Sequence, residues 1–265
     1  MWIKDQLYRE CYFSSTPKRI VCLVPSITEL ICDLGLESAL VGVTKFCVHP
    51  QHIRKQTTVV GGTKQVHYHK IRDLNPDIIL CNKEENTQEM IAELEAIAPV
   101  HISDINTIAN CIELIRMYGQ VFNCAPRAEQ LAEKIATAKT DFEKFTKTLP
   151  TREVAYFIWK DPWMLAANNT FIHYMLELNK FTNAFAHKKR YPELAPNTVY
   201  AHVDFVFLSS EPYPFKDLHK DLIHPQFPNA HVELIDGEMF SWYGSRLLLA
   251  FSYFKKLHNF VLRPK

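Results

Sequence analysis

Several classes of protein are disfavoured by what this sequence lacks. Its 30 lysine and arginine residues nearly balance 29 aspartate and glutamate residues, so there is no basic excess for nucleic acid and no acidic tail for a charged partner. No Gly-rich phosphate loop, nucleophile elbow or HExxH motif is present. No apolar run approaches the roughly 18 residues that suggest a membrane-spanning helix. These absences favour a binding protein over an enzyme, without nucleic-acid partners and without membrane insertion.

The cysteines form no recognisable disulfide or metal framework. They are odd in number, include no CxxC pair, and several lie inside apolar runs: Cys11, Cys22, Cys32, Cys47, Cys81, Cys111 and Cys124. This usage is typical of reduced, buried thiols in a reducing compartment. The N-terminal MWIKDQLYRECYF has no basic-then-apolar signal pattern. The sequence as it stands therefore predicts a cytoplasmic location, or a periplasmic one if an export signal was removed.

The opening of the chain predicts a βαβ unit. An apolar, β-branched run at residues 19–24 is typical of a buried strand, and Leu40–Val43 is a second strand. Between them we expect a helix capped by Ser26 or Thr28 and ended by Gly35. Two strands joined by a helix indicate a parallel sheet, in which ligands collect at the carboxyl ends of the strands.

The rest of the chain alternates strands and helices in two similar halves. Residues 77–84 and 204–211 both consist of an acid, an apolar strand, a polar turn and a glutamate. Between the halves, residues 126–148 carry one apolar stripe without glycine or internal proline, formed by Leu131, Ile135, Ala138, Phe142 and Phe145. At 1.5 Å per residue this helix is a stiff rod of roughly 34 Å. The pattern predicts two α/β lobes with a long helix between them.

The motifs along the chain resemble one known family. The opening LVPSITEL…GL…LVGVT, a GG-x-x turn, LNPDIIL, the long mid-chain helix and the terminal FSWYGSRLLLAFSYF occur in the order typical of class III solute-binding proteins. These are the vitamin B12 and iron-siderophore binders of ABC importers, also called helical-backbone metal receptors. The resemblance covers about residues 5 to 257.

The resemblance implies a fold, a ligand class and a partner. The fold is α/β, with two Rossmann-like lobes of mainly parallel sheets at 1–123 and 150–265, joined by one long rigid helix at 124–149. The ligand, held in the cleft between the lobes, is a corrinoid such as cobalamin or cobinamide, or a ferric chelate, and no cofactor is covalently attached. The protein is expected to be a monomer with an ABC permease as possible partner.

In the first lobe the resemblance implies ligand contacts at Pro25, Ser26, Lys45, Phe46 and His49. Phe46 matches in type the aromatic that the family's vitamin B12 binder packs on the corrin, and a flat macrocycle needs aromatic faces. The alternatives are a simple helix cap at Pro25-Ser26 and plain packing at the other positions.

In the second lobe aromatic and basic residues follow the strand ends. The expected ligand contacts there are Trp159, Trp163, Arg190, Tyr191, Phe240, Trp242 and Tyr243. Tryptophans favour ring stacking, and arginine pairs with carboxylate, phosphate or amide oxygens. Core burial is the alternative for the aromatic residues, and a solvated loop is the alternative for Arg190.

Two other functions remain open at this stage. Cys47 and His49, two residues apart, are weak candidates for binding a bare metal ion. The same pair would serve as nucleophile and base in a hydrolase acting on a corrinoid side chain. On importer-linked family members, surface glutamates dock the permease, and Glu85 and Glu211 are the corresponding candidates here. Asn82 departs from the family's vitamin B12 binder, which has a large aromatic nearby.

Overall fold

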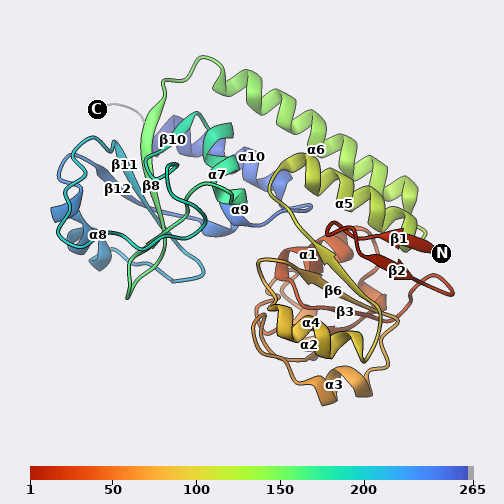
Figure 1. Ribbon diagram of the computed structural model, residues 1–265. Helices are drawn as coiled ribbons and strands as arrows, with labels where there is room; N and C mark the ends of the chain where they lie inside the picture. Colours follow the sequence, from red (N-terminus) through yellow and green to blue (C-terminus); the bar gives the residue numbers. More distant parts are fainter. Residues whose placement is uncertain (262–265) are drawn as a thin grey trace. The chain divides into compact units, whose positions relative to one another are not determined.

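The computed structural model describes residues 1–261, which divide into two units. The first unit contains residues 1–136 and 243–247, and the second contains residues 137–242 and the chain from 248 onward. Helix α6 (Ala125–Thr146) takes the chain from one unit into the other (Figure 1). The predicted α/β class with a long middle helix is confirmed. The lobe boundaries 1–123 and 150–265 stay a proposal, because the division between the units falls inside α6.

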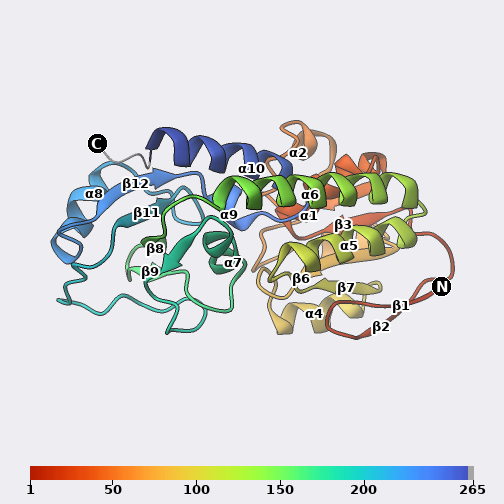
Figure 2. The ribbon, with the colours of Figure 1, turned by 90° about the horizontal axis from the view of Figure 1, so that it is seen from above.

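The first unit is built on a parallel sheet of five strands in the order β5-β4-β3-β6-β7, of which Figure 2 labels β3, β6 and β7. The strands are β3 (Ile20–Cys22), β4 (Leu40–Val43), β5 (Thr58–Val59), β6 (Ile78–Asn82) and β7 (Val100–Ser103). The helices are α1 (Pro25–Asp33), α2 (Ile53–Gln56), α3 (Tyr68–Asp73), α4 (Gln88–Glu95) and α5 (Ile108–Val121), with the 3-10 turn η1 (Glu37–Ala39). Alternate side chains of the strands pack with apolar residues of α3 and α4 in a buried core.

The second unit repeats this plan with a mixed sheet. Its strands lie in the order β10-β8-β11-β12, and β9 pairs antiparallel with β8. They are β8 (Arg152–Trp159), β9 (Met164–Leu165), β10 (Phe181–Asn183), β11 (Phe205–Ser209) and β12 (His231–Ile235). The helices are α7 (Phe171–Leu178), α8 (Leu218–Ile223), α9 (Gly237–Ser241) and α10 (Leu247–Lys256), with the 3-10 turn η2 (His224–Gln226) and the π-helical turn η3 (Leu257–Val261).

Helix α1 ends as predicted but begins differently. Gly35 has φ +79°, and the N–H groups of Gly35 and Leu36 donate to the carbonyls of Cys32 (2.8 Å) and Ile31 (3.0 Å), which is a Schellman motif. The predicted N-cap of α1 at Ser26 or Thr28 is wrong. The helix starts at Pro25, whose ring presets the helical φ, so Ser26 and Thr28 lie inside it.

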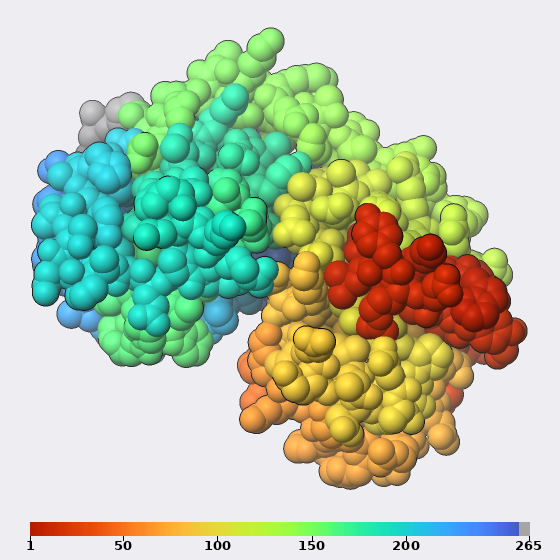
Figure 3. All heavy atoms as spheres, viewed as in Figure 1, coloured from red at the N-terminus to blue at the C-terminus, as the bar shows by residue number. Residues whose placement is uncertain are grey.

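An N-terminal hairpin that the sequence did not predict covers part of the first unit. Strands β1 (Trp2–Lys4) and β2 (Glu10–Tyr12) pair antiparallel, and Figure 3 shows this segment in red against the yellow surface of the unit. Asp5 Oδ2 accepts from the N–H of Ile102 (3.2 Å), and the N–H of Gln6 donates to the Ile102 carbonyl (3.2 Å). The hairpin is thus attached to edge strand β7.

None of the helices in the described part of the chain combines the length and apolar character needed to cross a bilayer.

His101, on β7, should make the first unit sensitive to acid. Its side chain is fully buried, and this desolvation lowers its pKa from 6.5 to about 4. The folded state therefore keeps the imidazole neutral while the unfolded state takes up a proton. The stability contribution is present above pH 6.5 and is lost as the pH falls toward 4, by on the order of 2–3 kcal/mol.

Urea unfolding between about pH 7 and pH 4.5 tests this expectation. His101→Leu should flatten the dependence of the unfolding free energy on pH, whatever its effect at neutral pH. His69→Gln, at an exposed histidine, should leave the dependence as in the wild type. Equal pH dependence in wild type and His101→Leu would contradict the assignment.

Candidate functional site

Phe46, an exposed aromatic residue of the first unit, lies just past the carboxyl end of β4. Its side chain is 49% exposed and lies against Gly62, where an added Cβ would stand 3.3 Å from its Cε2. Lys45 Nζ lies 5.0 Å from the centre of the Phe46 ring, and the Lys45 N–H donates to the Gly61 carbonyl (2.8 Å). The turns after β4 and β5 are thereby joined, and they present an aromatic face with a cation beside it.

Pro25 and Ser26 are buried, and Ser26 lies next to Tyr243. Burial raises the pKa of Tyr243 well above its ordinary value, Glu85 adds to the rise, and the nearby Ser103 and Ser26 hydroxyls oppose it. Tyr243 belongs to the first unit although it comes late in the chain. Ser26 and Tyr243 therefore lie close to each other within the first unit.

The segment of residues 243–247 is fastened to α1 and α5. Arg246 makes two hydrogen bonds to the Glu29 carboxylate, from Nε (2.8 Å) and Nη2 (2.7 Å), and both side chains are largely buried. The Gly244 N–H donates to Cys111 Sγ (3.1 Å). Burial raises the pKa of Glu29, while Arg246 and then His49 lower it. His49 is thus placed near this buried ion pair.

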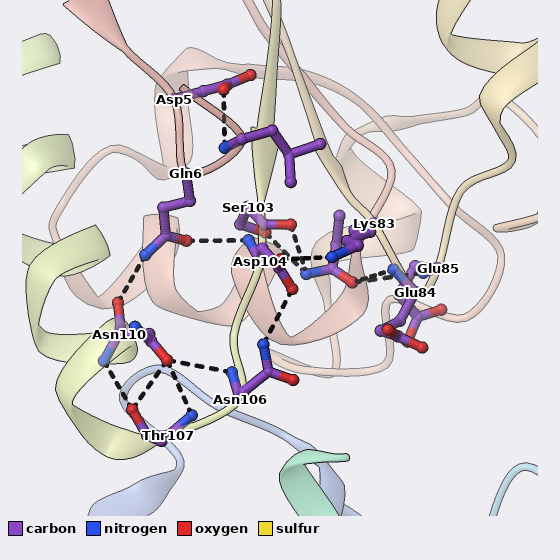
Figure 4. A network of polar contacts seen from close by, with 12 residues as sticks. Asp5, Gln6, Lys83, Glu84, Glu85, Ser103, Asp104, Asn106, Thr107 and Asn110 are labelled. Carbon is purple, nitrogen blue, oxygen red and sulfur yellow. Dashed lines mark hydrogen bonds and ion pairs between the residues drawn. The ribbon is translucent and has the colours of Figure 1, made fainter. Parts of the chain in front are cut away.

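Asn82 has a structural role at the carboxyl end of β6. Its Nδ2 donates to the carbonyl and Oγ of Ser103 (both 3.0 Å), and its Oδ1 accepts from the N–H groups of Glu84 (2.8 Å) and Glu85 (3.4 Å). Figure 4 shows this network together with the ion pair of Lys83 and Asp104 (2.7 Å). A large aromatic at position 82 would have none of these bonds. Asn82 therefore shapes the turn after β6.

Gln6 extends the same network to the N-terminal hairpin. Its Oε1 accepts from the Asp104 N–H (3.1 Å) and its Nε2 donates to the Asn110 carbonyl (2.9 Å), at the start of α5 (Figure 4). Sequence reasoning missed this role. Gln6 is 98 residues from Asp104, and no local pattern signals such a pairing.

Cys47 is fully buried among hydroxyl groups. Its Sγ lies 3.2 Å from Thr28 Oγ1 and 3.3 Å from Thr44 Oγ1, and burial raises the pKa of its thiol. A thiol in this state is a poor nucleophile and a poor metal ligand. Within residues 1–261, no three His, Cys, Asp or Glu side chains are grouped to hold a metal ion. All seven cysteines are free of disulfides; five are buried, and Cys32 and Cys124 are partly buried.

In the second unit, two tryptophans lie near the end of β8. Trp159 is 40% exposed and contacts Tyr213 edge to face (5.6 Å between ring centres). Trp163 stacks on Phe215 (5.6 Å, 12° between planes) at the margin of the core, and Lys160 Nζ lies 5.9 Å from its ring. Trp159 is therefore the more accessible of the two rings.

Arg190 and Tyr191 lie on an exposed loop that is attached to the chain after β9. The Arg190 N–H donates to the Asn168 carbonyl (2.7 Å), and its carbonyl accepts from the Ala167 N–H (2.8 Å). The guanidinium carbon of Arg190 lies 5.7 Å from the Tyr191 ring centre. A basic side chain is thus held beside an aromatic one, as at Lys45 and Phe46.

The remaining predicted residues of the second unit face inward. Phe240 is fully buried and packs against the rings of Tyr156 (5.3 Å) and Phe254 (4.7 Å). Trp242 Nε1 donates to Glu211 Oε1 (2.8 Å), which also accepts from the Ser241 hydroxyl (2.5 Å). Phe240 is thus part of the hydrophobic core of the second unit, and the Glu211 carboxylate is hydrogen-bonded to residues of the same unit.

The sequence matches one protein family and several curated proteins. Residues 20–212 match the family described as periplasmic binding protein. An uncharacterized ABC transporter substrate-binding lipoprotein, YvrC, of Bacillus subtilis is 25% identical over 205 residues, 74% of this chain and 65% of that protein. A cobalamin-binding protein of Halobacterium salinarum is 27% identical over 191 residues, 70% of this chain and 52% of that protein. The chain thus spans between half and two thirds of the length of these curated relatives.

Solved structures support the fold. The periplasmic vitamin B12 binding protein BtuF of Vibrio cholerae superposes with a TM-score of 0.79 at 18% identity, over 92% of this chain and 99% of that one. The petrobactin-binding protein YclQ of Bacillus subtilis gives a TM-score of 0.76 at 17% identity, over 100% and 99%. At such identities the likeness establishes the two-lobed fold alone. Because the family match covers most of the sequence, this chain belongs to the periplasmic binding protein family.

Proposed function

We propose that the protein binds a metal chelate, either a corrinoid or an iron chelate, for transport or intracellular handling. The observation that carries this proposal is that each unit has, near its strand ends, an aromatic ring that is at least partly exposed and lies beside a cation. Lys45 beside Phe46 represents it in the first unit, and Lys160 beside Trp163 and Arg190 beside Tyr191 represent it in the second. Aromatic faces suit a flat macrocycle, and cations suit its anionic groups.

The relatives support both the ligand class and a partner. The Halobacterium relative is a cobalamin-binding protein, and the Bacillus relative is a substrate-binding lipoprotein of an ABC transporter. We propose an ABC permease as the partner of a transport role. Glu85 and Glu211, the expected docking residues, are only partly exposed, and Glu211 is bonded to Trp242. Other surface acids are therefore better candidates for docking.

We propose that the protein binds its ligand and does not catalyse a reaction on it. The hydrolase and bare-metal alternatives both depended on Cys47, and its buried thiol with a raised pKa supports neither of them.

Spectral titration tests the proposal. The purified protein is titrated with cobalamin, cobinamide, haem and a ferric siderophore while the visible spectrum is followed. We expect saturable, one-to-one binding of at least one of these ligands with a Kd below about 10 μM. No binding of any of the four would contradict the proposed function.

A further inference from the structure

Glu85 is held firmly in the turn after β6. Its N–H and that of Glu84 donate to Asn82 Oδ1, and Asn86 Nδ2 donates to the carbonyl of Thr63 (2.9 Å) in the turn after β5. Asn82 and Asn86 are both buried. The turn that carries Glu85 is therefore tied to the turn that carries Gly62, which lies beside Phe46.

The carboxylate of Glu85 has no direct partner in the part of the chain that the structure describes. It is partly buried, and its hydrogen-bond and ion-pair capacity is unused among residues 1–261. Lys64, Glu84, Tyr243 and Cys47 are the charged or titratable groups that interact with it electrostatically. Burial raises the pKa of Glu85, Lys64 opposes this rise and Glu84 adds to it. A desolvated carboxylate without a bonded partner is costly, and such groups occur often at functional sites.

We propose that Glu85 accepts hydrogen bonds from N–H groups of the bound chelate and thereby determines specificity. An ionised carboxylate only accepts hydrogen bonds, so it favours a ligand rim that carries amide donors. Corrinoids have such amide side chains, whereas the rim of haem carries carboxylates, which Glu85 would repel. The inference rests on the proposed function and selects corrinoids within it.

Two matched variants test this role. Glu85→Gln removes the charge at the proposed contact, and Glu84→Gln removes the same charge one residue away. We expect Glu85→Gln to weaken cobinamide binding by about tenfold or more, since hydrogen bonds to charged groups are the strong ones. Glu84→Gln should change the affinity by less than about twofold. Haem, if it binds, should bind Glu85→Gln as tightly as the wild type or more tightly.

The pH dependence separates a ligand contact from a structural role. Wild-type affinity for cobinamide should fall on acidification as Glu85 takes up a proton, and Glu85→Gln should lose this dependence. Glu85→Asp, which keeps the charge, should retain the pH dependence and part of the affinity even if Glu85→Gln folds poorly.

The outcomes distinguish the inference from the function on which it rests. A wild type that binds none of the chelates would overturn the proposed function. A wild type that binds cobinamide, with Glu85→Gln binding equally well, would overturn only the role of Glu85. Equal losses for cobinamide and haem in Glu85→Gln would also overturn it, because they would indicate a general disturbance of the surface.

Discussion

Replacing Arg246 with alanine is expected to lower the free energy of unfolding by about 3–5 kcal/mol. The substitution removes two hydrogen bonds to Glu29 and leaves that carboxylate largely buried without its cation. It also releases the segment of residues 243–247 from α1. Urea unfolding of the wild type and the variant measures the difference.

A surface pair provides the matched control for this prediction. Arg116 makes the same two bonds to Glu129 (2.8 and 2.6 Å), but both side chains are about half exposed. Arg116→Ala should therefore cost no more than about 1 kcal/mol. Replacing Arg246 and Glu29 together by leucine should recover much of the loss, because no charge stays buried. Similar losses in Arg246→Ala and Arg116→Ala would show that burial of the pair is unimportant.

Phe46→Ala is expected to reduce affinity for the bound chelate by about 10- to 100-fold, as is typical of a central aromatic contact. The ring is half exposed and lies beside Gly62, so the free energy of unfolding should change by less than about 1 kcal/mol. Spectral titration and urea unfolding of the same preparation measure both quantities.

Tyr12→Ala is the control for the loss of an exposed aromatic ring. Tyr12 is 52% exposed, close to the 49% of Phe46, and lies on the N-terminal hairpin. The Tyr12→Ala substitution should leave the affinity for the chelate unchanged. Equal affinity of Phe46→Ala and the wild type would remove Phe46 from the site.

Most elements of the fold were predictable because their signals are local. The boundaries of β4 agree with the predicted strand at residues 40–43, and those of α6 lie within two residues of the predicted helix at 126–148. The N-terminal hairpin was missed because its strands have three residues each and depend on attachment to Ile102. The start of α1 was misplaced because the Ser26 capping pattern competes with Pro25, which presets the first helical residue.

The candidate site was less predictable, because aromatic residues serve cores and binding surfaces alike. Phe46 lies exposed near a strand end as expected, whereas Phe240 packs on Tyr156, 84 positions earlier in the sequence. The place of residues 243–247 in the first unit depends on the contact of Arg246 with Glu29, across 217 positions. Such contacts leave no trace in local sequence patterns.

The most direct test of the account is a crystal structure of the protein with cobinamide bound. We expect one bound molecule of cobinamide, with its ring against Phe46 and one of its amide groups within hydrogen-bond distance of Glu85. A corrinoid found away from both side chains would contradict the account.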